Sequence, residues 1–475
     1  MTSGMMAPLD RFRSWVKRRV KQWKVERIVE ELKLSDVQLR KVMQLLDDEM
    51  NKGLCKGTNP NAAIKMFPTY VRSIPDGTEE GNYLALDLGG TNFRVLLIRL
   101  NGSEVSMRSK IFLVPNFIMT GTAEELFDHI AECISKFMHE EGIADQKLPL
   151  GFTFSFPCKQ EGLARARLSQ WTKGFKVSGV EGEDIVRLLH EAIERRDDID
   201  VECVAVINDT VGAQISCAHE DRNCQIGLIL GTGSNACYME QLDKVETWDG
   251  DERAPRQVII NTEWGAFGDN GVLDFIRTQY DQELDAKFSV NPGKQLYEKM
   301  MSGMYLGELA RLYLERLVNE GLLFEGQSSD LLSTPGRFYT KYISEIESDK
   351  RDDFKNTKSV LEYDLGIENY SNADCHYVQY VCSLVSSRAA HLASCGCAVL
   401  LNRVARPSVT IAVDGSLYRF HPKFGDIMEQ KVSQLVNKGL KFKIMLSHDG
   451  SGKGAALVAA VACRIRDEQK RNGLI

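Results

Sequence analysis

Apolar residues along this chain gather in short continuous runs, and between these runs they recur at helical spacing. The continuous runs predict buried β-strands. They are Tyr83–Leu86, Phe93–Ile98, Leu148–Phe156, Val201–Ile207, Gln225–Leu230, Val409–Val413 and Lys441–Leu446. Strands of this kind, separated by helices, are typical of an α/β fold whose sheets are covered on both faces.

Helical spacing marks the segments between the strands. The first is a helix pair over Glu26–Gly53 with a cap at Ser35, and Thr120 or Thr122 caps a helix over Ala123–His139. Further helices are predicted at Gly182–Arg196, Gly271–Asp285, Gln295–Glu320, Asp374–Val404 and Leu457–Arg466. Because strands and helices alternate in two successive blocks, we expect two α/β domains that close on a cleft at the strand ends.

Four of the predicted strands run into glycine-containing turns with small hydroxyl residues. The turns lie at Gly89-Gly90-Thr91, Gly231-Thr232-Gly233, Asp414-Gly415-Ser416 and Gly450-Ser451-Gly452. Glycine lets the backbone approach a ligand closely, and successive amide N–H groups can form an anion-binding nest. A single Gly-Gly hairpin is most often only a hairpin. Its repetition predicts a nucleotide held between two related half-domains.

Acidic side chains follow several of these strands, at the positions where α/β folds bind their ligands. Asp87 lies at the mouth of the first glycine turn and could hold Mg²⁺ or its water shell. Asp209 follows the strand Val201–Ile207, but an aspartate before a helix is usually an N-cap. Glu263 and Glu298 can likewise be ordinary polar positions. The patterns alone leave both interpretations open.

Composition places the chain among ordinary soluble globular proteins, with 43% hydrophobic and 26% charged residues. Its 475 residues predict two or three domains. We find no secretory signal and no apolar run near the roughly 18 residues that a membrane span needs. The twelve cysteines are scattered, which predicts free thiols in a reducing, cytoplasmic compartment.

The N-terminal segment differs in charge from the rest of the chain. Residues 1–27 hold eight basic and two acidic side chains, a charge of +6, which leaves −13 on the remainder of the total of −7. Trp15, Val20 and Trp23 recur at helical spacing beside these cations. Residues 11–24 can therefore lie on an anionic membrane, or they can form a solvated extension packed on the protein body. Nucleic acid is not expected as a partner, because the rest of the chain is acidic.

Ten motifs in unbroken order resemble those of the eukaryotic hexokinase family, whose animal-type members include glucokinase. The first five are LDLGGTNFRV at Leu86, GTAEELFDHI at Gly121, LGFTFSFPC at Leu150, WTKGF at Trp171 and INDTVG at Ile207. The others are GTGSNACYME at Gly231, NTEWGAFGD at Asn261, NPGKQLYEKM at Asn291, VDGSLYRFHP at Val413 and DGSGKGAALVAAVA at Asp449. The resemblance covers about residues 26–466, and ten motifs in the same order exclude chance.

The resemblance implies an α/β, two-lobed actin-like fold of sugar-kinase ATPases, with duplicated ribonuclease H-like domains around an inter-lobe cleft. It implies phosphorylation of glucose, and of mannose and fructose, at the 6-hydroxyl by ATP with Mg²⁺. Asp209 would be the general base, and Lys173 would stabilise the transferring phosphoryl group. The sugar ligands would be Ser155, Phe156, Thr172, Lys173, Asn208, Asp209, Asn235, Glu263 and Glu298.

Nucleotide contacts are implied by the same resemblance. They would be Asp87, Gly89, Gly90, Thr91, Asn92, Thr232, Gly233, Thr340, Ser344, Asp414, Gly415, Ser416 and Ser451. No side chain would bind the metal directly, since Mg²⁺ would bridge the ATP phosphates near Asp87 and Asp209. A sugar phosphate would fit the turn at Asp87–Thr91, which makes glucose 6-phosphate a candidate inhibitor.

The resemblance also divides the chain. It implies a basic extension at 1–25, a large lobe of 26–75 and 208–449, a small lobe of 76–207 and 450–466, and a tail at 467–475. We expect a monomer with a single catalytic unit. Met304 and the length of Trp248–Gln257 favour a general hexokinase over a glucokinase. The basic N-terminus differs from the apolar mitochondrial anchor of some vertebrate hexokinases, so attachment to the mitochondrial outer membrane by that route is not expected.

Two other functions fit the same fold. One is a non-catalytic glucose sensor or scaffold, which would have lost Asp209 or a glycine of the phosphate turns, and none of these is lost. The other is an ATPase chaperone or filament protein, against which Thr172, Lys173 and Glu263 speak because they belong to the sugar-binding pattern.

Overall fold

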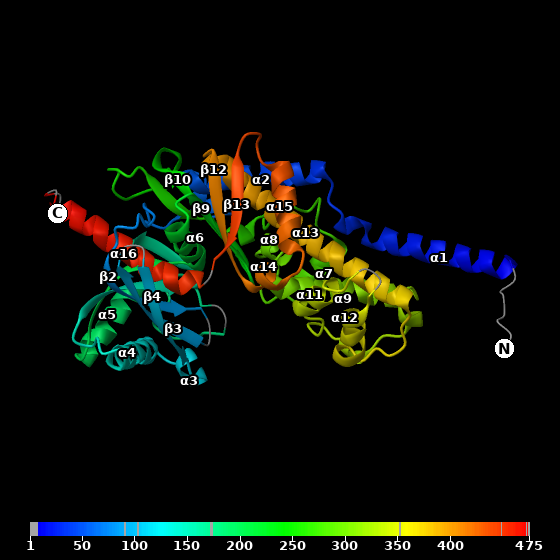
Figure 1. Ribbon diagram of the computed structural model, residues 1–475, viewed down its shortest axis with the longest axis horizontal. Coiled ribbons are helices and arrows are strands. Elements are labelled where there is room, and N and C mark those ends of the chain that lie inside the picture. Colours follow the sequence, from blue (N-terminus) through cyan, green and yellow to red (C-terminus); the bar gives the residue numbers. More distant parts are fainter. Residues whose placement is uncertain are drawn as a thin grey trace.

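The structure is a computed structural model that describes residues 8–89, 92–101, 104–171, 174–350, 353–447, 449–471 and 473, with side chains from residue 15 onward. Figure 1 shows a smaller α/β lobe that contains β2–β5 and a larger lobe that contains β9–β13, with a long N-terminal helix extending from the larger one. The predicted two-lobed α/β fold is confirmed.

The small-lobe sheet has the strand order β4-β3-β2-β5-β8. Its strands are β2 (Gly81–Leu88), β3 (Asn92–Asn101), β4 (Glu104–Leu113), β5 (Lys147–Phe154) and β8 (Asp200–Ile207). β2 and β3 form the predicted antiparallel hairpin, in which Leu88 pairs with Phe93. β5 and β8 run parallel to β2, so the carboxyl ends of β2, β5 and β8 lie at one edge.

Helices cover both faces of this sheet, because alternate residues of each strand point to opposite sides. Leu84, Leu86 and Leu88 join one core with the inner faces of α4 (Ala123–Glu140) and α5 (Ile185–Arg196). On the other face, Ala85 and Ala205 pack with the small side chains of α16 (Gly450–Arg471). The continuous apolar character of the strands follows from this double burial.

The large-lobe sheet has the order β1-β11-β10-β9-β12-β13. Its strands are β1 (Phe67–Pro68), β9 (Cys224–Leu230), β10 (Ser234–Gln241), β11 (Gln257–Asn261), β12 (Ser408–Asp414) and β13 (Lys441–Leu446). β9, β10 and β11 are antiparallel neighbours, and β12 and β13 run parallel to β9. Apart from β1, the two sheets therefore repeat one topology, as expected for related half-domains.

The remaining described elements surround these sheets. They are α2 (Asp36–Leu54), α3 (Asn116–Met119), β6 (Cys158–Gly162), β7 (Arg165–Leu168), α6 (Asp209–Glu220), α7 (Gln279–Lys287), α8 (Leu296–Lys299), α9 (Gly303–Asn319), α10 (Asp330–Ser333), α11 (Thr340–Glu347), α12 (Lys355–Ser359), α13 (Asn372–Val404), α14 (Ser416–Phe420) and α15 (Phe424–Leu435). The predicted caps at Ser35 and Thr122 are confirmed, each within a capping box. All twelve cysteines are free, and most are buried.

Helix α13 corrects one expectation from composition. Among the described residues it is long and apolar enough to cross a membrane, with a mean hydropathy of 1.4 over its most apolar window. However, 83% of that window is buried inside the protein, where α13 packs on α15, α2 and α9. Its apolar character follows from its place in the core.

Three predicted element boundaries are wrong. The helix expected to begin at Gly271 begins at Gln279, after a Thr278 cap, and Gln295–Glu320 is divided into α8 and α9. The segment after β13 is the first turn of α16 instead of a glycine loop. Glycine is needed there for close packing, because a Cβ atom on Gly454 would lie 2.2 Å from the backbone oxygen of Gly212 in α6.

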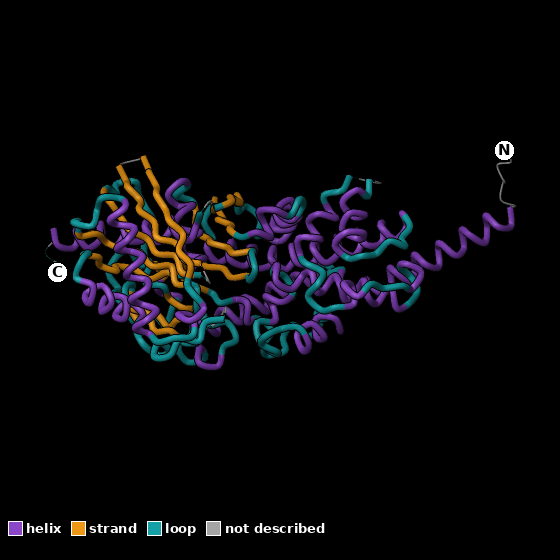
Figure 2. The backbone as a smooth tube through the Cα atoms, turned by 90° about the horizontal axis from the view of Figure 1, so that it is seen from below, coloured by secondary structure: helices purple, strands orange, loops and turns teal. Residues whose placement is uncertain are grey.

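The N-terminal helix, α1 (Pro8–Val29), is anchored on the large lobe through its C-terminal half. Val25 and Val29 are fully buried, and Lys21 Nζ lies 3.0 Å from a carboxylate oxygen of Asp374. Trp15 and Trp23 are 55% and 56% exposed, and Figures 1 and 2 show the helix extending away from the lobe.

The boundaries of the two lobes that the sequence analysis gives stay a prediction.

Candidate active site

A cleft of about 590 Å³ opens between the two sheets. Residues from β5, β8 and β11 contribute to its walls. Its lining includes Phe154, Phe156, Asn208, Asn261, Glu263, Asp269, Lys294 and Gln295. The inter-lobe cleft expected from the sequence is therefore present, and predicted sugar ligands line it.

Glu263 is held by two amide side chains. Asn261 Nδ2 donates to Glu263 Oε1 at 2.7 Å, and Asn235 Nδ2 donates to the same oxygen at 3.2 Å. Asn235 Nδ2 also donates to Asn261 Oδ1 at 2.8 Å. Burial raises the pKa of Glu263, and the nearby carboxylate of Asp209 raises it further. The result is a fixed acceptor that suits a neutral ligand with hydroxyl donors.

Glu298 is a second, half-buried acceptor in the same region. Its Oε2 accepts a hydrogen bond of 2.9 Å from the backbone N–H of Ser234, at the start of β10. Burial raises its pKa, and the charges of Glu263 and Asp209 raise it further. Ser234 and Asn235 are neighbours in β10 and bind Glu298 and Glu263 respectively, so the structure brings these two carboxylates to the same strand.

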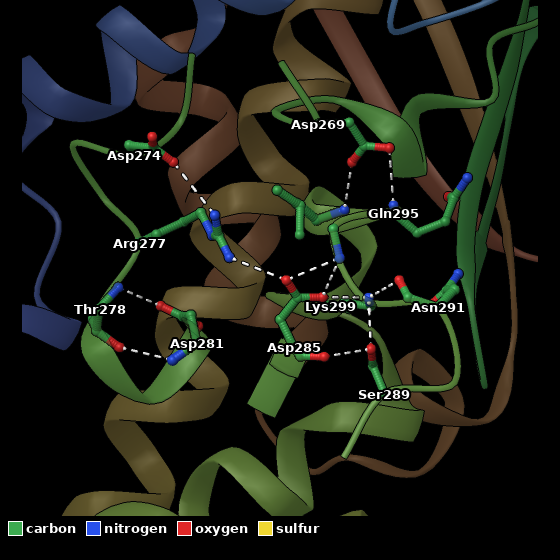
Figure 3. Close-up of polar contacts among 12 residues, drawn as sticks. Asp269, Asp274, Arg277, Thr278, Asp281, Asp285, Ser289, Asn291, Gln295 and Lys299 are labelled. Atoms are coloured by element: carbon green, nitrogen blue, oxygen red, sulfur yellow. Dashed lines mark hydrogen bonds and ion pairs between the residues drawn. The ribbon is translucent and has the colours of Figure 1, made fainter. Parts of the chain in front are cut away.

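A polar network behind the cleft fixes the segment that carries Glu298 (Figure 3). Lys299, the next residue, is buried. Its Nζ donates to Asp285 at 2.7 Å, to Ser289 Oγ at 2.9 Å and to the backbone oxygen of Asn291 at 2.8 Å. Asp285 also accepts from the backbone N–H of Gly293 at 3.0 Å. The loop before α8 is thus held at several points.

Asp269 holds the start of α8 itself. Its carboxylate accepts from the backbone N–H of Gln295 at 3.1 Å and of Leu296 at 3.0 Å (Figure 3). Gln295 has a left-handed backbone with φ of +58°, which few non-glycine residues adopt. Burial raises the pKa of Asp269. Sequence reasoning missed Asp269, Asp285 and Lys299, because their role depends on contacts between separate segments.

Asp209 is the first residue of α6, and the N-cap is its neighbour Asn208. Asn208 Oδ1 accepts from the backbone N–H of Thr210 at 2.7 Å. The interpretation of Asp209 as an N-cap is therefore wrong. A carboxylate in the first turn of a helix is stabilised by the helix dipole, and this one lies beside the Glu263 and Glu298 cluster.

A second pocket, of about 500 Å³, lies on the other side of the β9–β10 hairpin. It is lined by Gly231, Thr232, Gly303, Met304, Thr340, Lys341, Ser344, Glu345, Ser348, Ser416, Leu417, Phe420 and Pro422. The predicted nucleotide contacts Thr232, Thr340, Ser344 and Ser416 are among them. Met304, Glu345 and Pro422 are lining residues to which the sequence analysis gave no such role.

Two glycines are required where this pocket approaches the sugar cleft. Gly415 has φ of +125°, and a Cβ atom there would lie 2.2 Å from the backbone oxygen of Leu230. A Cβ atom on Gly233 would lie 2.6 Å from Glu298 Oε2. Asp414 Oδ1 accepts from the backbone N–H of Gly415 at 2.7 Å. The β9–β10 hairpin and the β12–α14 turn therefore pack directly against each other, with Glu298 beside the hairpin.

The first glycine hairpin is joined to the N-terminus of α16. Ser451 Oγ donates to Asp87 Oδ2 at 2.6 Å, and Arg94 Nη2 lies 3.2 Å from the same oxygen and also pairs with Asp449. A Cβ atom on Gly89 would lie 3.7 Å from Ser155 Oγ, so this hairpin borders the sugar side. Arg94 is a further residue that the sequence analysis did not single out.

Several predicted residues have simpler placements. Asn92 is the exposed first residue of β3, and Phe156 packs in an aromatic cluster with Phe154 and Trp171, at ring-centroid distances of 4.9 and 5.0 Å. Gly90, Thr91, Thr172 and Lys173 lie outside the described residues, so their roles stay predictions.

Within the described part of the chain, no group of His, Cys, Asp and Glu side chains is arranged to hold a metal ion.

The repeated sheet topology and the cleft between the sheets define a two-lobed α/β protein with the actin-like fold of sugar kinases. Comparison with known proteins gives the family. Two Hexokinase family profiles match residues 24–219 and residues 225–461. The chain belongs to the hexokinase family.

Individual relatives agree with this assignment. The chain is 50% identical over 452 residues to horse hexokinase-2 and 49% identical over 455 residues to human hexokinase-2. These matches cover 93% and 94% of this chain but 48% and 49% of the relatives, so the chain spans about half of their length. Among solved structures, a hexokinase from Schistosoma mansoni complexed with glucose is 46% identical. It has a TM-score of 0.85, and the match covers 93% of this chain and 99% of that one.

Proposed function

We propose that this chain transfers the γ-phosphoryl group of ATP to the 6-hydroxyl of glucose, and of mannose and fructose, as in the first step of glycolysis. The observation that carries the proposal is the pairing of a half-buried carboxylate–amide cluster around Glu263 and Glu298 with a glycine-lined pocket across one hairpin. Membership of the hexokinase family and a close structural relative that holds glucose support it.

The sugar side is assigned by its hydrogen-bonding chemistry. A hexose presents several hydroxyl groups, and each buried hydroxyl needs both a donor and an acceptor. Glu263 and Glu298 supply acceptors, and Asn208 and Asn235 supply amide groups. In this proposal Asp209 takes the proton of the 6-hydroxyl as that oxygen attacks the phosphorus of ATP.

The nucleotide side is assigned by its backbone and its small hydroxyl residues. Thr232, Thr340, Ser344 and Ser416 would contact ATP, and the glycines at 231, 233 and 415 let phosphate groups approach backbone N–H donors. The carboxylates of Asp87 and Asp209 suit the oxygen-preferring Mg²⁺ and its waters. When bound with ATP, Mg²⁺ would neutralise charge on the phosphates. Lys173 would add a positive charge at the transferring group.

The test is a kinetic assay of the purified chain. We expect glucose phosphorylation that needs both ATP and Mg²⁺ and saturates with glucose, in a titration from about 1 μM to tens of mM. Repeating the titration with glucose 6-phosphate added would show whether the product inhibits. Nucleotide and glucose binding without turnover would instead support the non-catalytic sensor.

We propose in addition that α1 contacts an anionic membrane surface. The observation in favour is that Trp15 and Trp23 stay more than half exposed beside several cations of the same helix. The Arg19 and Arg27 guanidinium groups lie 5.6 and 5.4 Å from the ring centroids of Trp15 and Trp23. Basic and aromatic side chains on one unpacked helix are typical of interfacial helices.

A further inference from the structure

A buried polar network lies behind the nucleotide pocket and does not line it. Its members are Glu347, the last residue of α11, and His421, the first residue after α14. Their side chains are 2% and 0% exposed, and His421 Nε2 lies 3.2 Å from Glu347 Oε1. Ser386, on the core helix α13, donates its hydroxyl to the same oxygen.

These residues sit directly behind the two opposing walls of the pocket. On α11, the face with Ser344 and Glu345 lines the pocket, whereas Tyr342, Ile346 and Glu347 are buried on the other face. After α14, Phe420 and Pro422 line the pocket, and His421 between them points into the protein. The contact between Glu347 and His421 therefore joins both walls from the protein side.

The hydrogen-bond partners of His421 define where its proton lies. Nδ1 accepts from the backbone N–H of Lys423 at 3.3 Å and of Phe424 at 3.1 Å, so this nitrogen carries no proton. The ring proton stands on Nε2 and is donated to Glu347 Oε1. One imidazole thus holds the start of α15 and the end of α11 at the same time.

We propose that Glu347, His421 and Ser386 are positioning residues that fix the separation of the two pocket walls and thereby the affinity for adenine nucleotide. α11 has eight residues and α14 has five, and helices this short depend on tertiary contacts for their place. The buried hydrogen bonds from His421 and Ser386 to Glu347 supply such contacts. The inference rests on the proposed function for the identity of the ligand.

The variants are chosen to separate the network from general stability. Glu347→Leu removes the shared acceptor, whereas Glu347→Gln keeps a carbonyl oxygen that can accept from both His421 and Ser386. His421→Asn keeps an acceptor for the start of α15 but is too short to reach Glu347. His190→Asn, at an exposed histidine that pairs with Glu194 on α5, is the control.

Calorimetry with a non-hydrolysable ATP analogue and Mg²⁺, at saturating glucose, measures the effect independently of turnover. We expect Glu347→Leu and His421→Asn to weaken analogue binding about five- to tenfold, as the loss of a buried hydrogen bond implies. Their dissociation constants for glucose should not change. Glu347→Gln and His190→Asn should match the unmodified chain. In steady-state kinetics, the KM for ATP should rise with little change in kcat.

Unchanged analogue binding in Glu347→Leu would overturn the inference, and so would an equal loss of glucose and nucleotide affinity. If Glu347→Leu does not fold, His421→Asn and Ser386→Ala decide by the same criteria. Binding of the analogue without sugar phosphorylation by the unmodified chain would overturn only the proposed function. Failure of the unmodified chain to bind the analogue would overturn both.

Discussion

The sugar cleft and the nucleotide pocket lie on the two sides of one hairpin but are built from different chemistry. The sugar cleft is lined by the half-buried carboxylate of Glu263, and the half-buried Glu298 lies near it, bound to the backbone of Ser234. The nucleotide pocket is lined by glycines and small hydroxyl residues, and its charged lining residues, Lys341 and Glu345, are both exposed. A neutral polyol needs carboxylate acceptors, whereas a polyanion is repelled by them.

The two sides also differ in how much local strain they contain. On the sugar side, Glu263 and Gln295 have left-handed backbones, and burial raises the pKa of Glu263 and Glu298. These features are unfavourable alone and persist because surrounding contacts hold them, as the network of Asp269, Asp285 and Lys299 does. On the nucleotide side, Oε1 of the buried Glu347 accepts hydrogen bonds from Ser386 and His421 behind the wall. Left-handed backbones and raised carboxylate pKa values thus occur together on the proposed sugar side.

The largest expected effect is on catalysis, through Asp209. Asp209→Ala should lower kcat by about 10²–10⁴-fold, since it removes the proposed general base. Glucose binding measured by calorimetry should stay largely intact, because Glu263 and Glu298 remain. Asp200→Ala, at the exposed start of β8, is the control and should keep full activity, because β8 is the strand that precedes Asp209. Retained turnover in Asp209→Ala would contradict the assignment of the base.

The next effect separates the sugar cleft from the nucleotide pocket directly. Glu263→Gln and Glu298→Gln should each weaken glucose binding by about 10–100-fold, as expected for a lost charge-assisted hydrogen bond. Binding of an ATP analogue should change little. Thermal unfolding should occur at the same temperature or higher, because a carboxylate with a burial-raised pKa is removed.

Glu194→Gln, at an exposed position on α5, serves as the control for these two variants. A parallel loss of nucleotide affinity in Glu298→Gln would show that the two sites are not separate. A large drop in melting temperature would show that the carboxylates support the fold instead of opposing it.

The network behind α8 gives a prediction about stability as well as binding. Lys299→Met breaks the buried pair with Asp285 and should lower the free energy of unfolding by about 3–5 kcal/mol. Glucose affinity should also fall, because Glu298 is the adjacent residue. The double variant Lys299→Met/Asp285→Asn should recover part of the stability, as denaturant titration would show. Lys287→Met, at an exposed ion pair on α7, should have little effect, and a similar loss there would remove the special role of Lys299.

The raised pKa values predict a pH dependence of opposite sign for binding and stability. Glucose hydroxyls donate to the ionised carboxylates, so glucose affinity should fall as pH drops through the raised pKa values of Glu263 and Glu298. A carboxyl whose pKa is raised on folding is destabilising above its folded pKa, and this penalty disappears as pH falls. Calorimetric titrations at several pH values, repeated with Glu298→Gln, should show a smaller dependence in the variant. An equal dependence would contradict the role of Glu298.

The smallest expected effect concerns α1, which belongs to neither cleft. The unmodified chain should sediment with vesicles that contain anionic lipid and should not sediment with neutral vesicles. Replacing Lys17, Arg18 and Arg19 by Gln should weaken this binding by about 1 kcal/mol per cation. Activity should not change. Equal sedimentation of the variant and the unmodified chain would contradict a membrane role for this helix.

The sequence predicts the strands better than it predicts the helices and their ends. Apolar runs such as Tyr83–Leu86 and Val409–Val413 lie within β2 and β12, because strands buried on both faces leave an unambiguous pattern. The predicted start of α7 is wrong, and so is the prediction of one helix where the structure has α8 and α9. The reason is that apolar spacing continues across loops that pack on the core. The glycines at 450–454 appeared to be a turn, whereas close helix packing requires them.

In the candidate site, too, some residues could be predicted from the sequence and others could not. Glu263, Glu298, Thr232 and Ser416 lie within the quoted motifs, because each motif stays close in sequence. Asp285 and Lys299 are 14 residues apart, and Glu347 and His421 are 74 apart, so only the fold shows that they pair. Positioning residues leave little signal in a single sequence because their chemistry depends on contact.

Phosphorus NMR of a reaction mixture with the purified chain, glucose, ATP and Mg²⁺ tests the central claim most directly. We expect one ADP for each hexose phosphate formed, with the phosphoryl group on the 6-oxygen and no release of inorganic phosphate above background. Inorganic phosphate without sugar phosphate, or an unchanged ATP spectrum, would contradict the account.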